Sequence, residues 1–323
     1  MNEISLIRDF WQPLGEAVTH PLVREGIGND GAVIATEPGY DQVITTDTLV
    51  EGVHFPVSAD AHAIGWRALA VNLSDLAAMG AEPVCYTLAL TLPAADRRWL
   101  DGFCNGLKDL SSLHGIQLVG GDTTQGPLSV TIQAQGRVPE GGSVPRRGGR
   151  PGDRICVSGT LGEAGEALNW LHRDAAGDRA VRSVLSRYYY PAPRLVPGTW
   201  LREQGVAAID ISDGLLTDLG RLLGEDGACG ARVDYRALPV SAELESLAGD
   251  RARMLAAVAG DDYELCFLWA EARGALPTSA ELGAPVTVVG RVEAESGVRL
   301  MDGDEPVIPE RQGYSHFAEE GGE

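Results

Sequence analysis

The chain has 323 residues, of which 44% are hydrophobic and 22% are charged, as in an ordinary soluble globular protein. Its formal net charge of −20 argues against nucleic acid or an anionic membrane as a partner. Apolar runs such as Tyr86 to Leu92 are too short to span a bilayer, and the start, MNEISLIRDF, lacks the regions of a signal peptide.

Cysteine and lysine usage narrow the class of protein further. The five cysteines are scattered and lack CxxC spacing, which indicates reduced thiols in a cytoplasm rather than a disulfide framework or a zinc site. Lys108 is the one lysine, and it does not follow a GxxxxG stretch, so a Walker-type phosphate loop is absent. The strand lysine and the HRDLxxxN catalytic loop of protein kinases are absent as well. If this protein handles nucleotide phosphates, it must neutralise them in another way.

In the N-terminal half, strands are predicted where β-branched residues cluster, as in the run VITT that begins at Val43. Helices are predicted where apolar residues recur at helical spacing. In chain order we expect a helix within residues 1–25, a glycine-flanked turn at 26–34, a strand from Val43 that ends at Asp47, a helix over 61–79 that ends at Gly80, a strand over 83–92, a helix over 96–113, a short strand over 117–119 that leads into a turn GGDTT, and a strand over 128–138.

A change of composition marks residues 139–152, PEGGSVPRRGGRPG, as a linker between an N-terminal domain, 1–138, and a C-terminal domain, 153–323. Two domains are also what this chain length favours. After the linker we expect a strand over 154–158, a glycine-spaced turn and a helix to about Leu171, helices over 180–204 broken at YYYPAPR, a strand over 207–212, a helix over 215–223, a turn into a strand within 258–268, and closing strands over 286–292 and 298–301.

Aspartate recurs where a strand-like run meets a turn rich in glycine or hydroxyl groups. The positions are Asp30, Asp47, Asp122, the pair Asp210 and Asp213, and the pair Asp261 and Asp262, with Asp75 on a helix as a further contributor. Carboxylates gathered from several strand ends suit Mg²⁺, whose usual co-ligands are substrate phosphates. The functional hypothesis is therefore an acidic pocket that binds a metal–nucleotide complex and transfers a phosphoryl group.

A simpler interpretation of the same turns remains open at this point. Aspartate and glycine are common turn residues, and an acidic chain carries many such turns. The stretch Ser212-Asp213-Gly214 fits a helix N-cap before Leu215 equally well.

The same turns, in the same order, resemble those of the thiamine-monophosphate kinases. The matching segments are GIGNDGAV, TTDTLVEGVHF, ALAVNLSDLAAMGAEP, LTLP, VGGDTT, RPGDRICVSGTLGEAG, AIDISDGL, GDDYELCF and QGYSHF, and they span nearly the whole chain. The resemblance implies an α/β fold of the aminoimidazole ribonucleotide synthetase type, with two domains and mixed or antiparallel sheets flanked by helices. It implies a cytoplasmic homodimer formed through the N-terminal sheets, with ATP as co-substrate and several Mg²⁺ ions in an acidic cleft. The implied reaction is direct in-line transfer from ATP to thiamine monophosphate, which gives thiamine diphosphate and ADP.

Carried over residue by residue, the resemblance implies three sets of site residues. The metal ligands would be Asp30, Thr45, Thr46, Asp47, Asp75, Asp122, Asp210 and Asp213. The residues that face ATP would be Gly121, Asp122, Arg146 and Ser212, and those that face thiamine monophosphate would be His54, Asp261 and Tyr314. We assign no catalytic base, because the attacking group is already a phosphate oxygen.

Three positions depart from the family pattern. Asn29 stands where the family usually has a second aspartate before Asp30, and Gly31 stands where alanine is common. Asp261 is one methylene shorter than the family's glutamate. These changes bear on one metal site and one substrate contact.

Two other functions remain as alternatives. One is another ATP-dependent synthetase of the same superfamily, although Cys85, the first cysteine, lies in an expected core strand and does not suit a selenophosphate-type enzyme. The other is an acidic protein that binds metal ions or a thiamine compound without catalysis. ADP release from ATP in the presence of thiamine monophosphate discriminates between these functions.

Asp210→Asn and Asp213→Asn are each expected to slow phosphoryl transfer while the protein stays folded, since the sequence places both at a solvent-facing turn. Loss of a residue that only hydrogen-bonds to a metal ligand lowers metal affinity or activity by about 10–100-fold. Loss of a ligand itself should lower the rate at least as much. Circular dichroism checks the fold and ADP release the rate. Unchanged turnover in both variants would remove them from the set of metal ligands.

Overall fold

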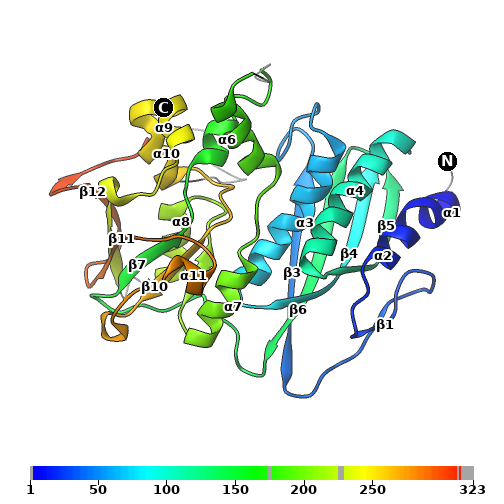
Figure 1. Ribbon diagram of the computed structural model, residues 1–323, viewed down its shortest axis with the longest axis horizontal. Coiled ribbons are helices and arrows are strands. Elements are labelled where there is room, and N and C mark those ends of the chain that lie inside the picture. The colour runs from blue at the N-terminus through cyan, green and yellow to red at the C-terminus, as the bar shows by residue number, and fades with distance from the viewer. Residues whose placement is uncertain (1–2, 174–176, 225–228, 311–312, 314–323) are drawn as a thin grey trace. The chain divides into compact units, whose positions relative to one another are not determined.

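The computed structural model describes residues 3–173, 177–224, 229–310 and 313, and the chain forms two compact units (Figure 1). The first unit holds the residues up to Ser143 together with Tyr189–Arg202, and the second holds Val144–Tyr188 and the residues from Glu203 onward. Sheets flanked by helices confirm the predicted α/β class. The division into domains 1–138 and 153–323, with a linker at 139–152, stays a prediction.

The first unit is built on a four-stranded sheet in the order β3-β6-β4-β5. β4 and β5 run parallel, and the other neighbouring pairs run antiparallel. The strands are β3 (Tyr40–Val50), β4 (Glu82–Leu92), β5 (Gln117–Gln125) and β6 (Ser129–Pro139). Along β6 every second residue is buried, from Val130 to Val138, so one face of the sheet packs on the core and the other is more open.

Helices α3 (Ala61–Ala78) and α4 (Arg97–His114) pack against each other, and α3 covers β3 and β6 (Figure 1). Both helices begin at an aspartate N-cap, Asp60 and Asp96, whose side chains accept backbone N–H groups. The remaining elements of this unit are α1 (Glu3–Leu6), the π-helical turn η1 (Ile7–Trp11), α2 (Gln12–Ala17), α7 (Leu195–Gln204), and a small ribbon of β1 (Val23–Glu25) and β2 (Val33–Ile34).

The second unit is built on a seven-stranded mixed sheet in the order β13-β12-β9-β11-β7-β10-β8. Its strands are β7 (Arg154–Ser158), β8 (Ala208–Asp210), β9 (Gly230–Asp234), β10 (Leu265–Trp269), β11 (Val286–Glu293), β12 (Gly297–Asp302) and β13 (Glu305–Pro306). Its helices are α5 (Glu163–Ala167), α6 (Arg179–Tyr189), α8 (Leu215–Leu223), α9 (Ala242–Ala248), α10 (Ala252–Val258) and α11 (Ser279–Leu282), with short 3-10 turns at Tyr235–Ala237, Gly249–Arg251 and Glu271–Arg273. The core of this unit includes the fully buried face of α8, Leu215, Leu219 and Leu222.

Two strands extend further than the sequence indicates, and this changes the setting of two acidic residues. β3 continues to Val50, so the prediction that Asp47 ends the strand is wrong. β5 continues through GGDTT to Gln125, so Asp122 lies in a strand rather than in a turn. Both are edge strands of the sheet. At an edge, threonine favours the pleated backbone and polar side chains remain accessible, so a polar run can continue the strand.

Other differences are smaller. The helix after GTLGEAG ends at Ala167 rather than near Leu171, and β9, α9 and α10 were not anticipated. Among the residues that the structure describes, none of the helices combines the length and apolar character needed to cross a bilayer.

Gly106→Ala is expected to destabilise the first unit, because a Cβ at Gly106 in α4 would overlap the carbonyl oxygen of His62 in α3. Overpacking of this kind costs about 1–3 kcal/mol, and more where backbone must move. Gly220→Ala in α8 is the matched control, since the nearest atom outside the helix backbone is Val298 Cγ2 at 3.9 Å. That change should be neutral or stabilise by up to about 1 kcal/mol. Urea unfolding measures both, and equal effects would contradict this account of the α3–α4 contact.

Candidate functional site

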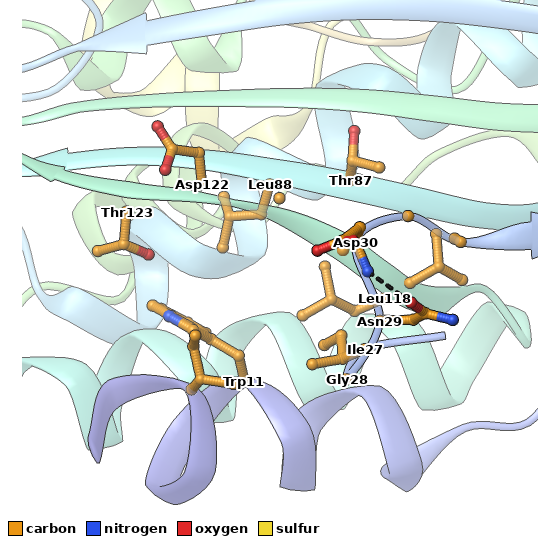
Figure 2. A pocket seen from close by; sticks show the side chains of 16 residues that line it. Trp11, Ile27, Gly28, Asn29, Asp30, Thr87, Leu88, Leu118, Asp122 and Thr123 are labelled. Carbon is orange, nitrogen blue, oxygen red and sulfur yellow. Dashed lines mark hydrogen bonds between the residues drawn. The ribbon is translucent and has the colours of Figure 1, made fainter. Parts of the chain in front are cut away.

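A cavity of about 610 Å³ lies in the first unit, beside β4 and β5 (Figure 2). Its apolar lining includes Trp11, Ile27 and Leu118, and its polar lining includes Asp30 and Asp122. This volume lies within the range of about 300–1,000 Å³ that is usual for small-molecule sites. An apolar wall beside carboxylates suits a ligand with an aromatic part and a charged part.

Asp30 reaches the cavity from the loop between β1 and β2. Its backbone N–H donates to Asn29 Oδ1 at 2.9 Å (Figure 2). Asn29 Nδ2 donates in turn to Glu25 Oε2 at 3.0 Å. Asn29 and Asp30 are both exposed and both line the cavity. Two of the three positions that depart from the expected pattern, Asn29 and Gly31, therefore line this cavity.

Asp122 borders the cavity from β5, next to two glycines. Gly121 has a φ of +151°, and a Cβ there would overlap the backbone of Leu88 in β4. Glycine is thus required for the two strands to approach this closely. In Figure 2 the side chain of Thr123 extends toward Trp11, whereas that of Asp122 extends from the other side of the strand.

A second acidic group forms where β3 faces α3. The Thr45 hydroxyl donates to Asp75 Oδ2, and the Asp47 backbone N–H donates to Asn72 Oδ1 at 3.1 Å. Asn72 is fixed in turn, because its Nδ2 donates to the carbonyl oxygen of Ala68 at 3.0 Å. Burial raises the pKa of Asp47 to about 7, and repulsion from Asp75 adds to the effect. A cation between these carboxylates would relieve that repulsion.

Thr46 and His54 have different surroundings. Side chains alternate along a strand, so Thr46 lies on the opposite face of β3 from Thr45 and Asp47, and it is exposed. His54 lies in the turn after β3, where its Nδ1 accepts the Val50 backbone N–H at 3.0 Å.

In the second unit, the predicted acids follow β8. Asp210 is the last residue of β8 and is only 7% exposed, so the expectation that it faces solvent is wrong. Asp213 is half-buried and forms an ion pair with Arg221 of α8. Gly214 is the N-cap of α8, so Ser212 and Asp213 are not its capping residues.

Asp218 organises this turn from inside α8. Its Oδ2 accepts the backbone N–H groups of Ser212, Asp213 and Gly214 at 3.0, 2.9 and 3.2 Å, and its Oδ1 accepts Arg221 Nη1 at 2.7 Å. Burial raises the pKa of Asp218, against the opposing effect of the N–H groups. The sequence analysis missed Asp218 and Arg221. An acidic residue in the first turn of a helix was the signal that could have found Asp218.

Asp261 lies beside the same turn, because its backbone N–H donates to the carbonyl oxygen of Ser212 at 2.9 Å. Arg146 is exposed in the segment before β7. Tyr314 lies outside the described residues. The structure therefore places Asp30 and Asp122 in the lining of one cavity, brings Thr45 and Asp47 to Asp75, and brings Asp261 to the turn after β8.

The acids form pairs rather than a complete metal site. Within the part of the chain that the structure describes, no three histidine, cysteine, aspartate or glutamate side chains come close enough to hold a metal ion among themselves. Mg²⁺ is usually held by one or two carboxylates together with substrate phosphates and water. Small groups of oxygen donors, such as Asp47 with Asp75, therefore fit Mg²⁺ that arrives with a phosphorylated ligand.

Comparison with known sequences places these features in a family. AIR synthase related protein, N-terminal domain, matches residues 28–138, and AIR synthase related protein, C-terminal domain, matches residues 150–303. The thiamine-monophosphate kinases of Salmonella typhimurium (strain LT2) and Escherichia coli (strain K12) are each 43% identical to the chain over 302 residues, which is 92% of this chain and 93% of each relative.

Solved structures agree with the sequence comparison. The crystal structure of thiamine-monophosphate kinase from Stenotrophomonas maltophilia K279a is 40% identical, with a TM-score of 0.85, and the match covers 95% of this chain and 98% of that one. AaThiL complexed with AMPPCP and TMP is 29% identical, with a TM-score of 0.77, and the match covers 98% of this chain and 97% of that one.

Asp218→Asn is expected to lower the stability of the second unit by about 1–3 kcal/mol, because an amide cannot satisfy the three N–H groups and Arg221 together. Amide hydrogen exchange should also become faster at Ser212, Asp213 and Gly214. The control is Asp250→Asn, which changes an exposed carboxylate. Equal stability and unchanged exchange in the two variants would show that Asp218 does not organise the turn.

Proposed function

This chain belongs to the thiamine-monophosphate kinase family, and we propose that Mg²⁺ ions held by its acidic pairs mediate the reaction of that family. The protein is an ATP-dependent kinase that phosphorylates thiamine monophosphate to thiamine diphosphate. The observation that carries this function is the 43% identity with thiamine-monophosphate kinases over 92% of the chain. The match to AaThiL complexed with AMPPCP and TMP, over 98% of the chain, supports it.

Counter-charge is the main physical requirement of this reaction. Both substrates carry phosphate, and they repel each other when they are brought into line. The chain has one lysine, Lys108, on the exposed part of α4, and a net charge of −20. Cations that bind with the substrates therefore have to supply most of the positive charge.

We assign the metal ligands to oxygen donors of both units. The set is Asp30, Thr45, Thr46, Asp47, Asp75, Asp122, Asp210 and Asp213. The pairing of Asp47 with Asp75 and the common cavity of Asp30 and Asp122 support this assignment. Bound Mg²⁺ would screen the phosphates and stabilise the charge that develops on the transferred group.

The cavity beside β5 is the proposed site of the nucleotide. Trp11 and Ile27 offer an apolar wall to an aromatic base, and Gly121 and Asp122 of β5 also line the cavity. Arg146 and Ser212 complete the proposed ATP contacts. In this arrangement the protein orients the triphosphate, and the carboxylates keep its bound cations in place.

Thiamine monophosphate is assigned to His54, Asp261 and Tyr314. The thiazolium ring is cationic, so a carboxylate and an aromatic ring are suitable partners for it. The acceptor is a phosphate oxygen that needs no deprotonation, and accordingly no residue is given the role of catalytic base. The contribution of the protein is to hold donor and acceptor in line and to exclude water.

A homodimer through the N-terminal sheet and a cytoplasmic location are part of the proposal. The open face of the four-stranded sheet carries Ile44, which is 55% exposed, next to threonines and glutamines on β3 and β6. Burial of this face against a second copy would remove Ile44 from water. The odd number of cysteines and their lack of CxxC spacing support a reducing compartment.

Phosphorus NMR of the protein with ATP, Mg²⁺ and thiamine monophosphate is expected to show thiamine diphosphate and ADP forming in equal amounts. Removal of Mg²⁺ with EDTA should stop the reaction and Mn²⁺ should restore it. Ca²⁺ should support little turnover because its coordination geometry is looser. Release of inorganic phosphate alone would contradict the assigned acceptor, and full activity with Ca²⁺ would contradict the assigned role of the metal.

A further inference from the structure

The loop between α10 and β10 has an unusual backbone. Asp261 and Tyr263 have φ angles of +69° and +51°, and they are the non-glycine residues with positive φ in the described ranges. For a bulky side chain such as tyrosine this conformation is unfavourable. Such strain persists only where the surrounding structure holds the backbone in place.

Asp262, between the two strained residues, anchors the loop on one side. It is 4% exposed, and its two carboxylate oxygens accept the same Gly162 backbone N–H at 2.9 and 2.8 Å. Glu264, the next acid along, accepts Ser158 Oγ at 2.6 Å and Arg187 Nη2 at 2.8 Å. These buried contacts fix the loop to the segment around β7 and to α6.

The backbone of the loop is anchored on the other side by the turn after β8. The Asp261 N–H donates to the Ser212 carbonyl oxygen and the Tyr263 N–H donates to the Ile211 carbonyl oxygen, both at 2.9 Å. A Cβ at Gly260 would overlap that same Ser212 carbonyl oxygen, so the two segments are in close contact. The positions of Asp261 and of the Asp210–Asp213 turn are therefore coupled.

The backbone conformation of this loop directs the Tyr263 side chain back to the carboxylate of Asp261. The Tyr263 hydroxyl donates to Asp261 Oδ1 at 2.9 Å. Tyr263 is only 8% exposed, so its ring is held by packing, whereas Asp261 is half-buried and accessible to a ligand. A rigid donor on an accessible carboxylate restricts the orientation of that carboxylate before any ligand binds.

We propose that Tyr263 is a positioning residue, whose hydroxyl orients the Asp261 carboxylate toward the cationic part of thiamine monophosphate. This inference rests on the proposed assignment of Asp261 to that substrate. Backbone strain at Asp261 and Tyr263 is then the cost of bringing donor and carboxylate together, and Asp262 holds the loop in that state.

Tyr263→Phe removes the hydroxyl and leaves the ring, so the protein should fold normally. Loss of this one hydrogen bond to a carboxylate should raise KM for thiamine monophosphate about tenfold. KM for ATP and kcat should change by less than about threefold. Tyr86→Phe is the matched control, since it removes another buried hydroxyl, which contacts Ser111 Oγ at 3.1 Å in the first unit. The control should leave both KM values unchanged.

A double-mutant cycle separates this inference from the proposed function. If Tyr263 acts through Asp261, then Tyr263→Phe should have little further effect on KM in an Asp261→Asn background. An unchanged KM in Tyr263→Phe, with a raised KM in Asp261→Asn, would overturn the positioning role alone. Additive effects in the double variant would overturn it as well. An unchanged KM in Asp261→Asn would instead overturn the assignment of Asp261 to the substrate and, with it, this inference.

Discussion

Electrostatic repulsion is the constraint on which the arrangement of this molecule depends. Two phosphorylated substrates must meet on a chain that has one lysine and a net charge of −20. A phosphate loop with a lysine would solve the problem within the protein. In the proposed mechanism, carboxylates of the protein act together with cations that arrive with the phosphates. On that proposal, the acidic character of the chain contributes to the binding of ATP.

The carboxylates of the proposed site do not all lie at the ends of strands. Asp47 and Asp122 lie within the two edge strands of the first sheet. In the second unit, buried side chains shape the turn after β8, because Asp218 gathers its N–H groups and Arg221 neutralises part of the charge. The network around Asp262 adds a strained loop beside that turn. Buried polar contacts therefore hold the half-buried Asp213 and Asp261 in place.

The sequence predicted the elements with periodic apolar residues well. Helices over 61–79 and 215–223 and the strand over 154–158 agree with the structure within a few residues. Strand ends were predicted less well, because Asp47 and Asp122 have the composition of a turn, and only the pairing with neighbouring strands keeps them extended. The acids of the proposed metal set could be named from the sequence, and their roles stay predictions. Their partners were harder to find, since Asp218, Arg221 and Tyr263 act through contacts that only the folded chain creates.

The central claim is that carboxylates of this chain bind divalent cations together with the substrates. Anomalous scattering from Mn²⁺, in crystals grown with a non-hydrolysable ATP analogue and thiamine monophosphate, tests it directly. The account predicts Mn²⁺ at about 2.1 Å, a typical distance for a small divalent cation, from oxygens of Asp47 or Asp75 and of Asp30 or Asp122, with phosphate oxygens as further ligands. Mn²⁺ peaks remote from these carboxylates, with the phosphates contacted by arginine side chains alone, would contradict it.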